Sequence, residues 1–227
     1  MAREILTVPR ALMRSSRVNW FLDHRGQDAG PTTNNIEQMF FSAFPRFVGS
    51  PQLRLRRETV LHWRAIVSMV RGRERVLRVP MIDPLGTDWD SMAGAFAAQG
   101  VPFSNEQRFS TGQGFAYEPF GLAVGATAMG ATQITVDYSP TGVPVQMGQR
   151  LSHDDWPFEV VAVLSTSGTQ QVLQVEPAIR STVTDGDVVH FEARGLFEVV
   201  DVGAAAPHYG RDHFATPEVT LREVINR

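Results

Sequence analysis

The 227-residue sequence predicts a mainly β protein, a β-rich α+β fold, on three observations. It contains 19 glycines and 14 prolines, a composition that favours many turns. Its second half contains six short strand-like segments separated by turn residues. Only residues 57–71 have the apolar spacing of a long helix. We therefore expect one helix packed on β-structure in the first part of the chain, and a small antiparallel β-barrel or sandwich in the second.

The N-terminal part is expected to alternate strands with loops. Residues 4–22 predict one or two strands, of which RVNWFL is the clearest. Residues 24–35 are rich in Gly, Pro and Asn without periodicity, and they predict a long exposed loop. Residues 38–56 are aromatic and β-prone, and their Pro45 and Pro51 favour edge or irregular strands.

Residues 57–71 predict an amphipathic helix. Gly72 follows the last apolar residue, as is typical of a helix C-terminus. Residues 75–83 then alternate in polarity and predict a return strand. The apolar face of the helix consists of Val60, Trp63, Ile66, Val67 and Val70.

Residues 84–119 differ from the rest of the chain because they are polar, Gly-rich and irregular. A short helix is expected inside them, with Asp90 or Ser91 as its N-cap. A long segment with little regular structure is usually functional or forms an interface. We therefore expect an irregular arm here.

Turn residues join the six strand-like segments of the second half, a pattern typical of a barrel or sandwich. We place this β domain at 132–202, after a first domain at 1–131, with 203–227 as a tail that returns to the first domain. The six segments are residues 132–138, 143–152, 156–165, 170–177, 188–193 and 196–202.

Charge is divided unevenly along the chain, and every basic residue other than histidine is arginine. Residues 1–80 hold 14 Arg against 6 Asp and Glu, whereas residues 81–227 hold 7 against 18. Such asymmetry favours polar partners or self-association through complementary charge. The arginines are dispersed and no recognition motif accompanies them, so we expect no sequence-specific nucleic-acid binding.

Several classes of protein and site are excluded or disfavoured. The chain has no cysteine, which excludes disulfide frameworks, thiolate metal sites and cysteine nucleophiles. The N-terminus lacks the apolar region of a secretory signal. Residues 120–131, the longest weakly polar stretch, are too short to span a bilayer. We expect a soluble protein without a membrane partner.

The best chemical candidate is His153, Asp154 and Asp155, since these residue types bind metals and move protons. They lie between two strand-like segments, however, where Asp is a favoured turn residue. A metal site needs three or four converging ligands, and the local sequence supplies no further ones. We therefore predict that this stretch is a hairpin turn.

The remaining candidates are weaker. No G-x-S-x-G motif supports Ser-His-Asp catalysis, and Asp185–Gly186–Asp187 lacks the further oxygen ligands of a calcium loop. We assign no catalytic, cofactor-binding or metal-binding residue, expect no cofactor, and predict a protein that is not an enzyme. The other candidates considered are Asp88 and Asp90, His208, Asp212 and His213, and the helical His62.

Two blocks of sequence resemble a known family when taken in order. The first, residues 54–86, joins a helix carrying Trp to a return strand; the second, residues 142–200, follows a pattern of short strands. The matching positions of the first block are Trp63, Arg71, Gly72, Arg73, Val79, Pro80, Asp83 and Pro84. Those of the second are Gly148, Val160, Val163, Val175, Pro177, Arg180, Asp185, Gly186 and Phe191.

The ordered pair resembles the distal tail proteins of siphophages and of related gene transfer agents. This resemblance implies an N-terminal split β-barrel-like domain that forms a ring, typically a homohexamer, at the tail tip of the virion. The ring would join the tail tube protein to the hub and fibre proteins of the baseplate, after synthesis in the host cytoplasm. Residues 84–119 depart from the family pattern, and we interpret them as an arm that contacts a neighbour.

Other functions are kept as alternatives. A carbohydrate-binding or hydrolytic module would use the residues at 153–155, the acids at 88 and 90, or the terminal histidines. A nucleic-acid binder would use the arginine-rich half. Another minor tail or tail-completion protein on the same type of fold is a closer variant of the first hypothesis.

Overall fold

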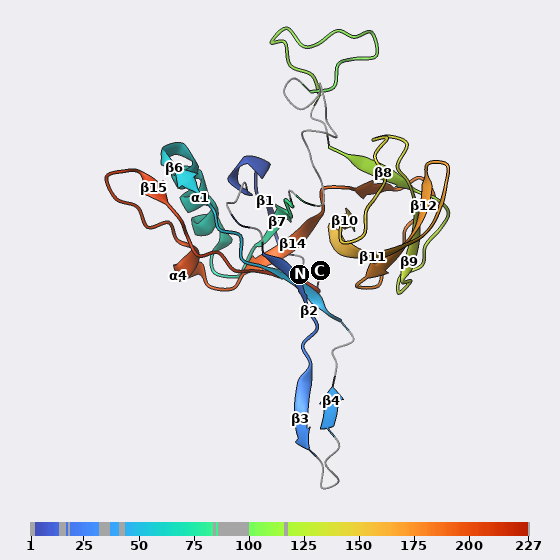
Figure 1. Cartoon of the computed structure of the whole chain (residues 1–227). Coiled ribbons are helices and arrows are strands. Elements are labelled where there is room, and N and C mark those ends of the chain that lie inside the picture. The colour runs from blue at the N-terminus through green and yellow to red at the C-terminus, as the bar shows by residue number, and fades with distance from the viewer. Residues whose placement is uncertain are drawn as a thin grey trace. The chain divides into compact units, whose positions relative to one another are not determined.

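The chain folds into two compact units, described here from a computed structural model (Figure 1). Unit 1 comprises Met1–Val79 and Leu196–Arg227, and unit 2 comprises Pro80–Gly195. Unit 2 is therefore an insertion in unit 1. One main helix, a six-stranded sheet and a closed β-barrel confirm the predicted β-rich fold class. The structure describes residues 3–13, 17, 19–31, 37–40, 44–83, 85, 100–115 and 118–226, with 27–31 and 37–40 as strands alone.

Unit 1 is built on a six-stranded sheet of order β1-β7-β14-β16-β5-β2. β1 runs parallel to β7, whereas β14, β16, β5 and β2 pair antiparallel in turn. The chain leaves for unit 2 after β7 and returns on β14, so the two crossing strands are neighbours in the sheet. The strands are β1 (Ile5–Thr7), β2 (Trp20–Asp23), β5 (Arg46–Gly49), β7 (Val76–Pro80), β14 (Arg194–Val199) and β16 (Leu221–Glu223).

Smaller elements complete unit 1. β3 (Gln27–Pro31) and β4 (Glu37–Phe40) pair antiparallel and form a two-stranded sheet of their own. The loop predicted at 24–35 is thus wrong for 27–31, because pairing with β4 gives these residues a strand conformation that their composition does not favour. The others are the 3₁₀-helix η1 (Arg10–Met13), β6 (Leu55–Arg56) paired with β15 (Phe214–Ala215), and the short α4 (Val202–Ala205).

The main helix, α1 (Arg57–Val70), buries the whole predicted apolar face, including the fully enclosed Trp63. The Trp63 Nε1–H donates to the carbonyl of Ala205 at 2.9 Å, which ties the helix to α4. The helix ends one residue earlier than predicted, and Arg71 (φ 47°) shares the left-handed exit with Gly72 (φ 76°). No helix in the described part of the chain is both long and apolar enough to cross a membrane.

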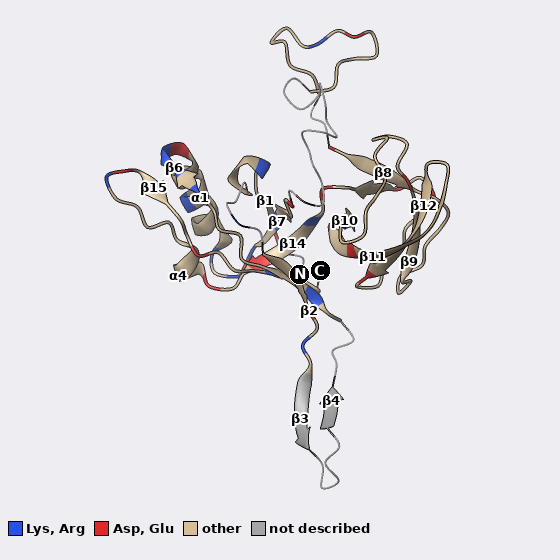
Figure 2. Ribbon diagram, viewed as in Figure 1, with Lys and Arg blue, Asp and Glu red and all other residues tan. Residues whose placement is uncertain are grey.

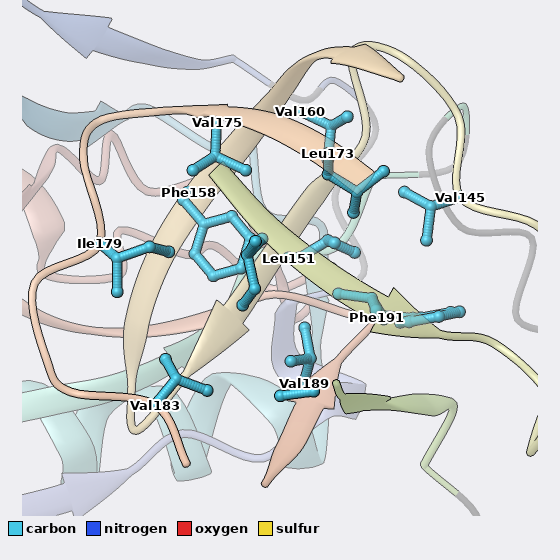
Figure 3. Close-up of a cluster of buried hydrophobic side chains, with 13 residues drawn as sticks. Val145, Leu151, Phe158, Val160, Leu173, Val175, Ile179, Val183, Val189 and Phe191 are labelled. Carbon is cyan, nitrogen blue, oxygen red and sulfur yellow. The ribbon is translucent and has the colours of Figure 1, made fainter. Parts of the chain in front are cut away.

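Unit 2 contains a closed six-stranded antiparallel barrel of order β10-β11-β12-β9-β8-β13, in which β13 returns to pair with β10. Its interior is filled by aliphatic side chains and two phenylalanines that point toward one another, among them Phe158, Leu173 and Phe191 (Figure 3). The strands are β8 (Phe120–Ala123), β9 (Gln133–Asp137), β10 (Arg150–His153), β11 (Trp156–Ser167), β12 (Gln170–Glu176) and β13 (Val188–His190).

The barrel has the predicted number of strands but a different membership. β8 belongs to it although its sequence was not predicted as a strand. A Cβ on its Gly121 would lie 2.7 Å from side-chain atoms of Val136 and Phe191, so packing requires a glycine that weakens the strand pattern. β14 belongs instead to the sheet of unit 1.

The boundaries of the compact units accordingly differ from those predicted at 131/132 and 202/203. They lie at Val79/Pro80 and Gly195/Leu196, where the chain crosses between units. The C-terminal segment pairs with strands from the first half of the chain, β16 with β5 and β15 with β6. These long-range pairings, which local sequence patterns do not encode, decide where each unit begins and ends.

Candidate functional site

Asp154 and Asp155 form the two-residue turn of the β10–β11 hairpin, as predicted. His153 pairs with Trp156 across the turn, and both aspartates have positive φ, 48° and 62°. Positive φ at both central positions is typical of a type I′ turn, whose twist matches that of the flanking strands. Asp tolerates this conformation better than most residues other than glycine and asparagine.

His153 is buried at the base of this turn, with 5% of its surface exposed. Its Nδ1 lies 3.0 Å from Ser181 Oγ, and its Nε2 lies 3.3 Å from Asp187 Oδ2. Asp154 is more distant, with its carboxylate 3.8 Å from Nδ1 and largely exposed. Both ring nitrogens are thus engaged by partners about 30 residues away in the sequence, on the segment that precedes β13.

Asp187 also closes the turn before β13. Its Oδ2 accepts the Thr184 backbone N–H at 2.7 Å, and this bond lowers the pKa of Asp187 below 3.8. Asp185 accepts the Gly125 backbone N–H at 2.7 Å, and Gly186 has φ 84°. The prediction that residues 185–187 form a turn is confirmed.

Ser181, His153 and Asp187 are the residue types of a catalytic triad, and the structure brings them together. A nucleophile and its base must lie within hydrogen-bonding distance, which Ser181 and His153 satisfy. The carboxylate also holds the loop backbone, and the imidazole is enclosed. We interpret the set as a polar clasp that fixes the segment before β13 against the β10–β11 hairpin.

A second set of charged side chains surrounds Asp155, which is buried. Arg194 Nε lies 3.0 Å from Asp155 Oδ1 in an ion pair, although the N–H is not aligned as a hydrogen bond, and the Arg194 backbone N–H donates to Ser152 Oγ at 2.9 Å. Glu118 lies 3.7 Å from Arg194 and 3.6 Å from His190. Burial, and then the Arg194 guanidinium, lower the pKa of His190 below 6.5.

The chain segments that enter and leave unit 2 both attach to this end of the barrel. The Met81 N–H donates to the Ala193 carbonyl at 2.7 Å, which pairs the two segments with each other. Asp83 on the entering segment receives Arg150 Nη1 at 2.6 Å, and Arg194 on the leaving segment binds Asp155. The β10–β11 hairpin therefore anchors both segments, a role that its sequence alone did not indicate.

The other predicted candidates are not brought together. His62, His208 and His213 are exposed, and the carboxylate of Asp212 accepts the Phe214 backbone N–H at 3.5 Å. Asp88 and Asp90 lie outside the described residues. Within the described ranges, no group of three His, Asp or Glu side chains is arranged to hold a metal ion.

Sequence reasoning missed Ser181 and Arg194 as partners of the hairpin, and Arg150 as its link to the entering segment. Ser181 and Arg194 lie 28 and 42 residues from the side chains they contact. Closure of the barrel, which places β13 beside β10, brings them there. No spacing in the sequence could reveal this.

Among the described strands, the sheet of unit 1 has an open edge on each side. β1 and β2 are its end strands, and each pairs with one neighbour among the described strands. Each carries an exposed large apolar side chain, Ile5 on β1 and Phe21 on β2. Open edges present unpaired backbone groups and are ready to pair with another chain.

Charge follows the division into units. Unit 1 holds 17 arginines and 11 acids, a net of +6, whereas unit 2 holds 4 and 13, a net of −9. Figure 2 shows arginines on α1, β6 and the sheet, and acidic residues on the barrel, including β11. Opposite net charges of this kind favour electrostatic attraction between unlike units.

No protein-family model matches the chain, and no curated protein sequence matches it.

Proposed function

We propose that this protein is a structural subunit of a phage tail tip, a distal tail protein of a siphophage or a related gene transfer agent. Copies assemble into a ring, typically of six, that joins the tail tube to the hub and fibre proteins of the virion. The protein is not an enzyme in this proposal, and it needs no cofactor. The sequence blocks at 54–86 and 142–200 support it by resemblance.

The observation that carries the proposal is the sheet of unit 1 with two unlike open edges. β1 at one edge is paired in parallel, whereas β2 at the other is paired antiparallel, so the edges are not equivalent. Joining one edge to the other in the next copy is a heterologous contact, which closes into a ring when the rotation permits. It would also satisfy exposed backbone groups and cover Ile5 and Phe21.

Two further features support assembly. The β3–β4 sheet has only two strands, and an isolated two-stranded sheet is marginally stable in water, so a neighbour in an assembly would stabilise it. The opposite net charges of the units favour contacts between unit 1 of one copy and unit 2 of another.

Sedimentation velocity and negative-stain microscopy of the purified full chain test the proposal. We expect a concentration-dependent closed oligomer that appears as a ring, and binding to the tail tube protein encoded in the same genome. A strict monomer at about 100 μM that ignores both tube and hub proteins would contradict the proposal.

The Ser181–His153–Asp187 contact provides the test against the hydrolytic alternative. We expect the unmodified protein to have no activity toward ester or glycoside substrates. Ser181→Ala should leave ring formation unchanged. A hydrolase activity that disappears in Ser181→Ala would overturn the structural assignment.

A further inference from the structure

Residues 100–115 of unit 2, which we call the Phe loop, consist of a repeated turn (the green loop in Figure 1). FSNEQ (103–107) and FSTGQ (109–113) follow each other at a spacing of six. In each, the Phe N–H donates to the carbonyl of the Gln, at 2.8 and 2.9 Å. The fourth residue has positive φ in both, Glu106 at 65° and Gly112 at 78°.

The repeat brings three phenylalanines into one cluster. Phe103, Phe109 and Phe115 pack edge to face in a triangle, with ring centroids 5.0 to 5.3 Å apart. They remain 38%, 45% and 50% exposed, and no residue of the Phe loop is fully buried. Fixing such a loop costs conformational entropy, and three half-exposed rings bury little apolar area to offset that cost. The cluster is therefore suited to docking on another surface.

Unit 1 has a depression of matching size and character beside α1. Its volume is about 200 Å³, and it is lined by Arg57, Val60, Leu61, Tyr209 and His213. A cavity of about 150 Å³ suffices for a benzene ring. Leu61 and Tyr209 are 51% and 46% exposed, so apolar surface at this depression faces outward.

The walls of the depression are held in place by hydrogen bonds. The Arg57 N–H donates to the His213 carbonyl at 2.9 Å, and Arg64 Nη1 donates to the Tyr209 hydroxyl at 2.9 Å. A preformed apolar depression is a good acceptor for an aromatic side chain, because little ordering remains to be done on binding.

We propose that the Phe loop of one copy docks its aromatic cluster into the depression beside α1 of a second copy. This rests on the self-association proposed above and names surfaces that form it. The charges argue for a second copy as the occupant. The Phe loop itself is neutral, with Glu106 and Arg108, but it belongs to a unit of net −9, whereas the depression is lined by Arg57 and belongs to a unit of net +6. Because the two surfaces are different, the contact runs head to tail and is compatible with a ring.

Thiol trapping tests this contact in the full chain, which has no native cysteine. The variant with both Phe109→Cys and Leu61→Cys is treated with a short bis-maleimide crosslinker. We expect covalent trimers and larger species, because each copy carries two different linked positions. Each single-cysteine variant is expected to give no species above a dimer, since one thiol joins two chains at most.

The outcomes separate the docking proposal from the ring proposal. An unmodified protein that forms rings while the double variant gives no species above a dimer overturns the docking alone. Efficient dimers from Phe109→Cys alone also overturn it, because they place Phe loops against each other. Crosslinks between positions 109 and 61 of the same chain, with a yield that does not depend on protein concentration, overturn it as well. A protein that is monomeric throughout contradicts the proposed function itself.

A second experiment measures the contact without crosslinking. Phe109→Ser and Leu61→Asp are each expected to weaken self-association at least tenfold in sedimentation equilibrium, and the double variant to be no weaker than the worse single variant. Met147→Ser, at an exposed apolar side chain of unit 2 outside the Phe loop, is the control and should leave it unchanged. Unchanged association in both single variants, with circular dichroism showing them folded, overturns the proposal.

Discussion

At the scale of single residues, the two aspartates of the β10–β11 turn have different roles although they are neighbours with the same conformation. Asp154 is largely exposed, whereas Asp155 is buried and paired with Arg194. Left-handed backbone geometry explains why both are Asp rather than a β-branched residue. Only the ion pair explains why Asp155 also needs its charge.

The pair Asp155→Asn and Asp154→Asn tests this difference, because Asn keeps the shape and tolerates positive φ. We expect Asp155→Asn to lower the free energy of unfolding of the barrel by about 1–3 kcal/mol, less than for a fully buried pair because Arg194 is one-third exposed. Asp154→Asn should change it by less than about 0.5 kcal/mol. Urea denaturation measures both, and equal effects would contradict the assignment.

His190 predicts acid sensitivity in a defined pH range. Its folded pKa is lowered by burial, so the unfolded chain takes up protons first as the pH falls through 6.5. The stability from neutral His190 is therefore full above pH 6.5 and is lost on acidification toward the folded pKa. Asp187, whose pKa is lowered below 3.8, adds a loss only at lower pH.

Urea midpoints between pH 7.5 and pH 5 check this prediction. We expect the unmodified protein to lose stability over this range and His190→Gln to lose less, because the neutral amide cannot be protonated there. The groups that face His190 are Glu118, Arg194, Asp155 and His153. His208→Gln, at an exposed histidine, is the control. A pH dependence of stability in His190→Gln equal to that of the unmodified protein would refute the prediction.

At the scale of elements, the pairing of β2 with β5 depends on a missing side chain. Trp20 lies opposite Gly49, and a Cβ on Gly49 would fall 2.1 Å from the Trp20 ring. Trp20 cannot easily move, since its ring packs 5.1 Å from that of Phe197 on β14. The packing of the Trp20 ring over Gly49 therefore fixes the pairing of β2 with β5.

Gly49→Ala is accordingly expected to destabilise unit 1 by about 1–3 kcal/mol through overpacking. Gly210→Ala is a suitable control, because a Cβ there would lie 3.4 Å from Asp212 Oδ1, an ordinary contact. Thermal unfolding followed by circular dichroism measures both. A Gly49→Ala protein as stable as the control would show that the Trp20 ring has room to shift.

At the scale of the whole molecule, the inserted barrel gives each copy two units of opposite charge. Between copies, the opposite net charges favour contacts in which a unit of net +6 meets one of net −9. Such complementarity speeds association and fixes which surfaces meet more than it strengthens the final contact.

Self-association is therefore predicted to weaken with salt. Raising NaCl from about 50 mM to about 500 mM shortens the Debye length from roughly 14 Å to roughly 4 Å and should weaken self-association severalfold. Sedimentation velocity at both concentrations measures the change. Association that strengthens with salt would indicate a contact governed by apolar burial alone.

The sequence by itself determined the fold class, the helix and the nature of the hairpin. The apolar face of α1, from Val60 to Val70, is set by spacing along the chain, and a helix at that spacing has one way to bury it. The turn at Asp154 and Asp155 is equally local, because turn chemistry depends on the residues within it.

Only the tertiary structure decided the membership of the barrel, the boundaries of the units and the partners of the hairpin. β8, which was not predicted as a strand, belongs to the barrel, and β14, which was predicted in the barrel, belongs to the sheet of unit 1. Long-range pairing, and not composition, assigns a strand to a sheet. Ser181, Asp187 and Arg194 reach His153 and Asp155 because the barrel closes through β10 and β13. The stretch from His153 to Asp155 is a local turn by sequence, and an anchor for two crossing segments by virtue of the fold.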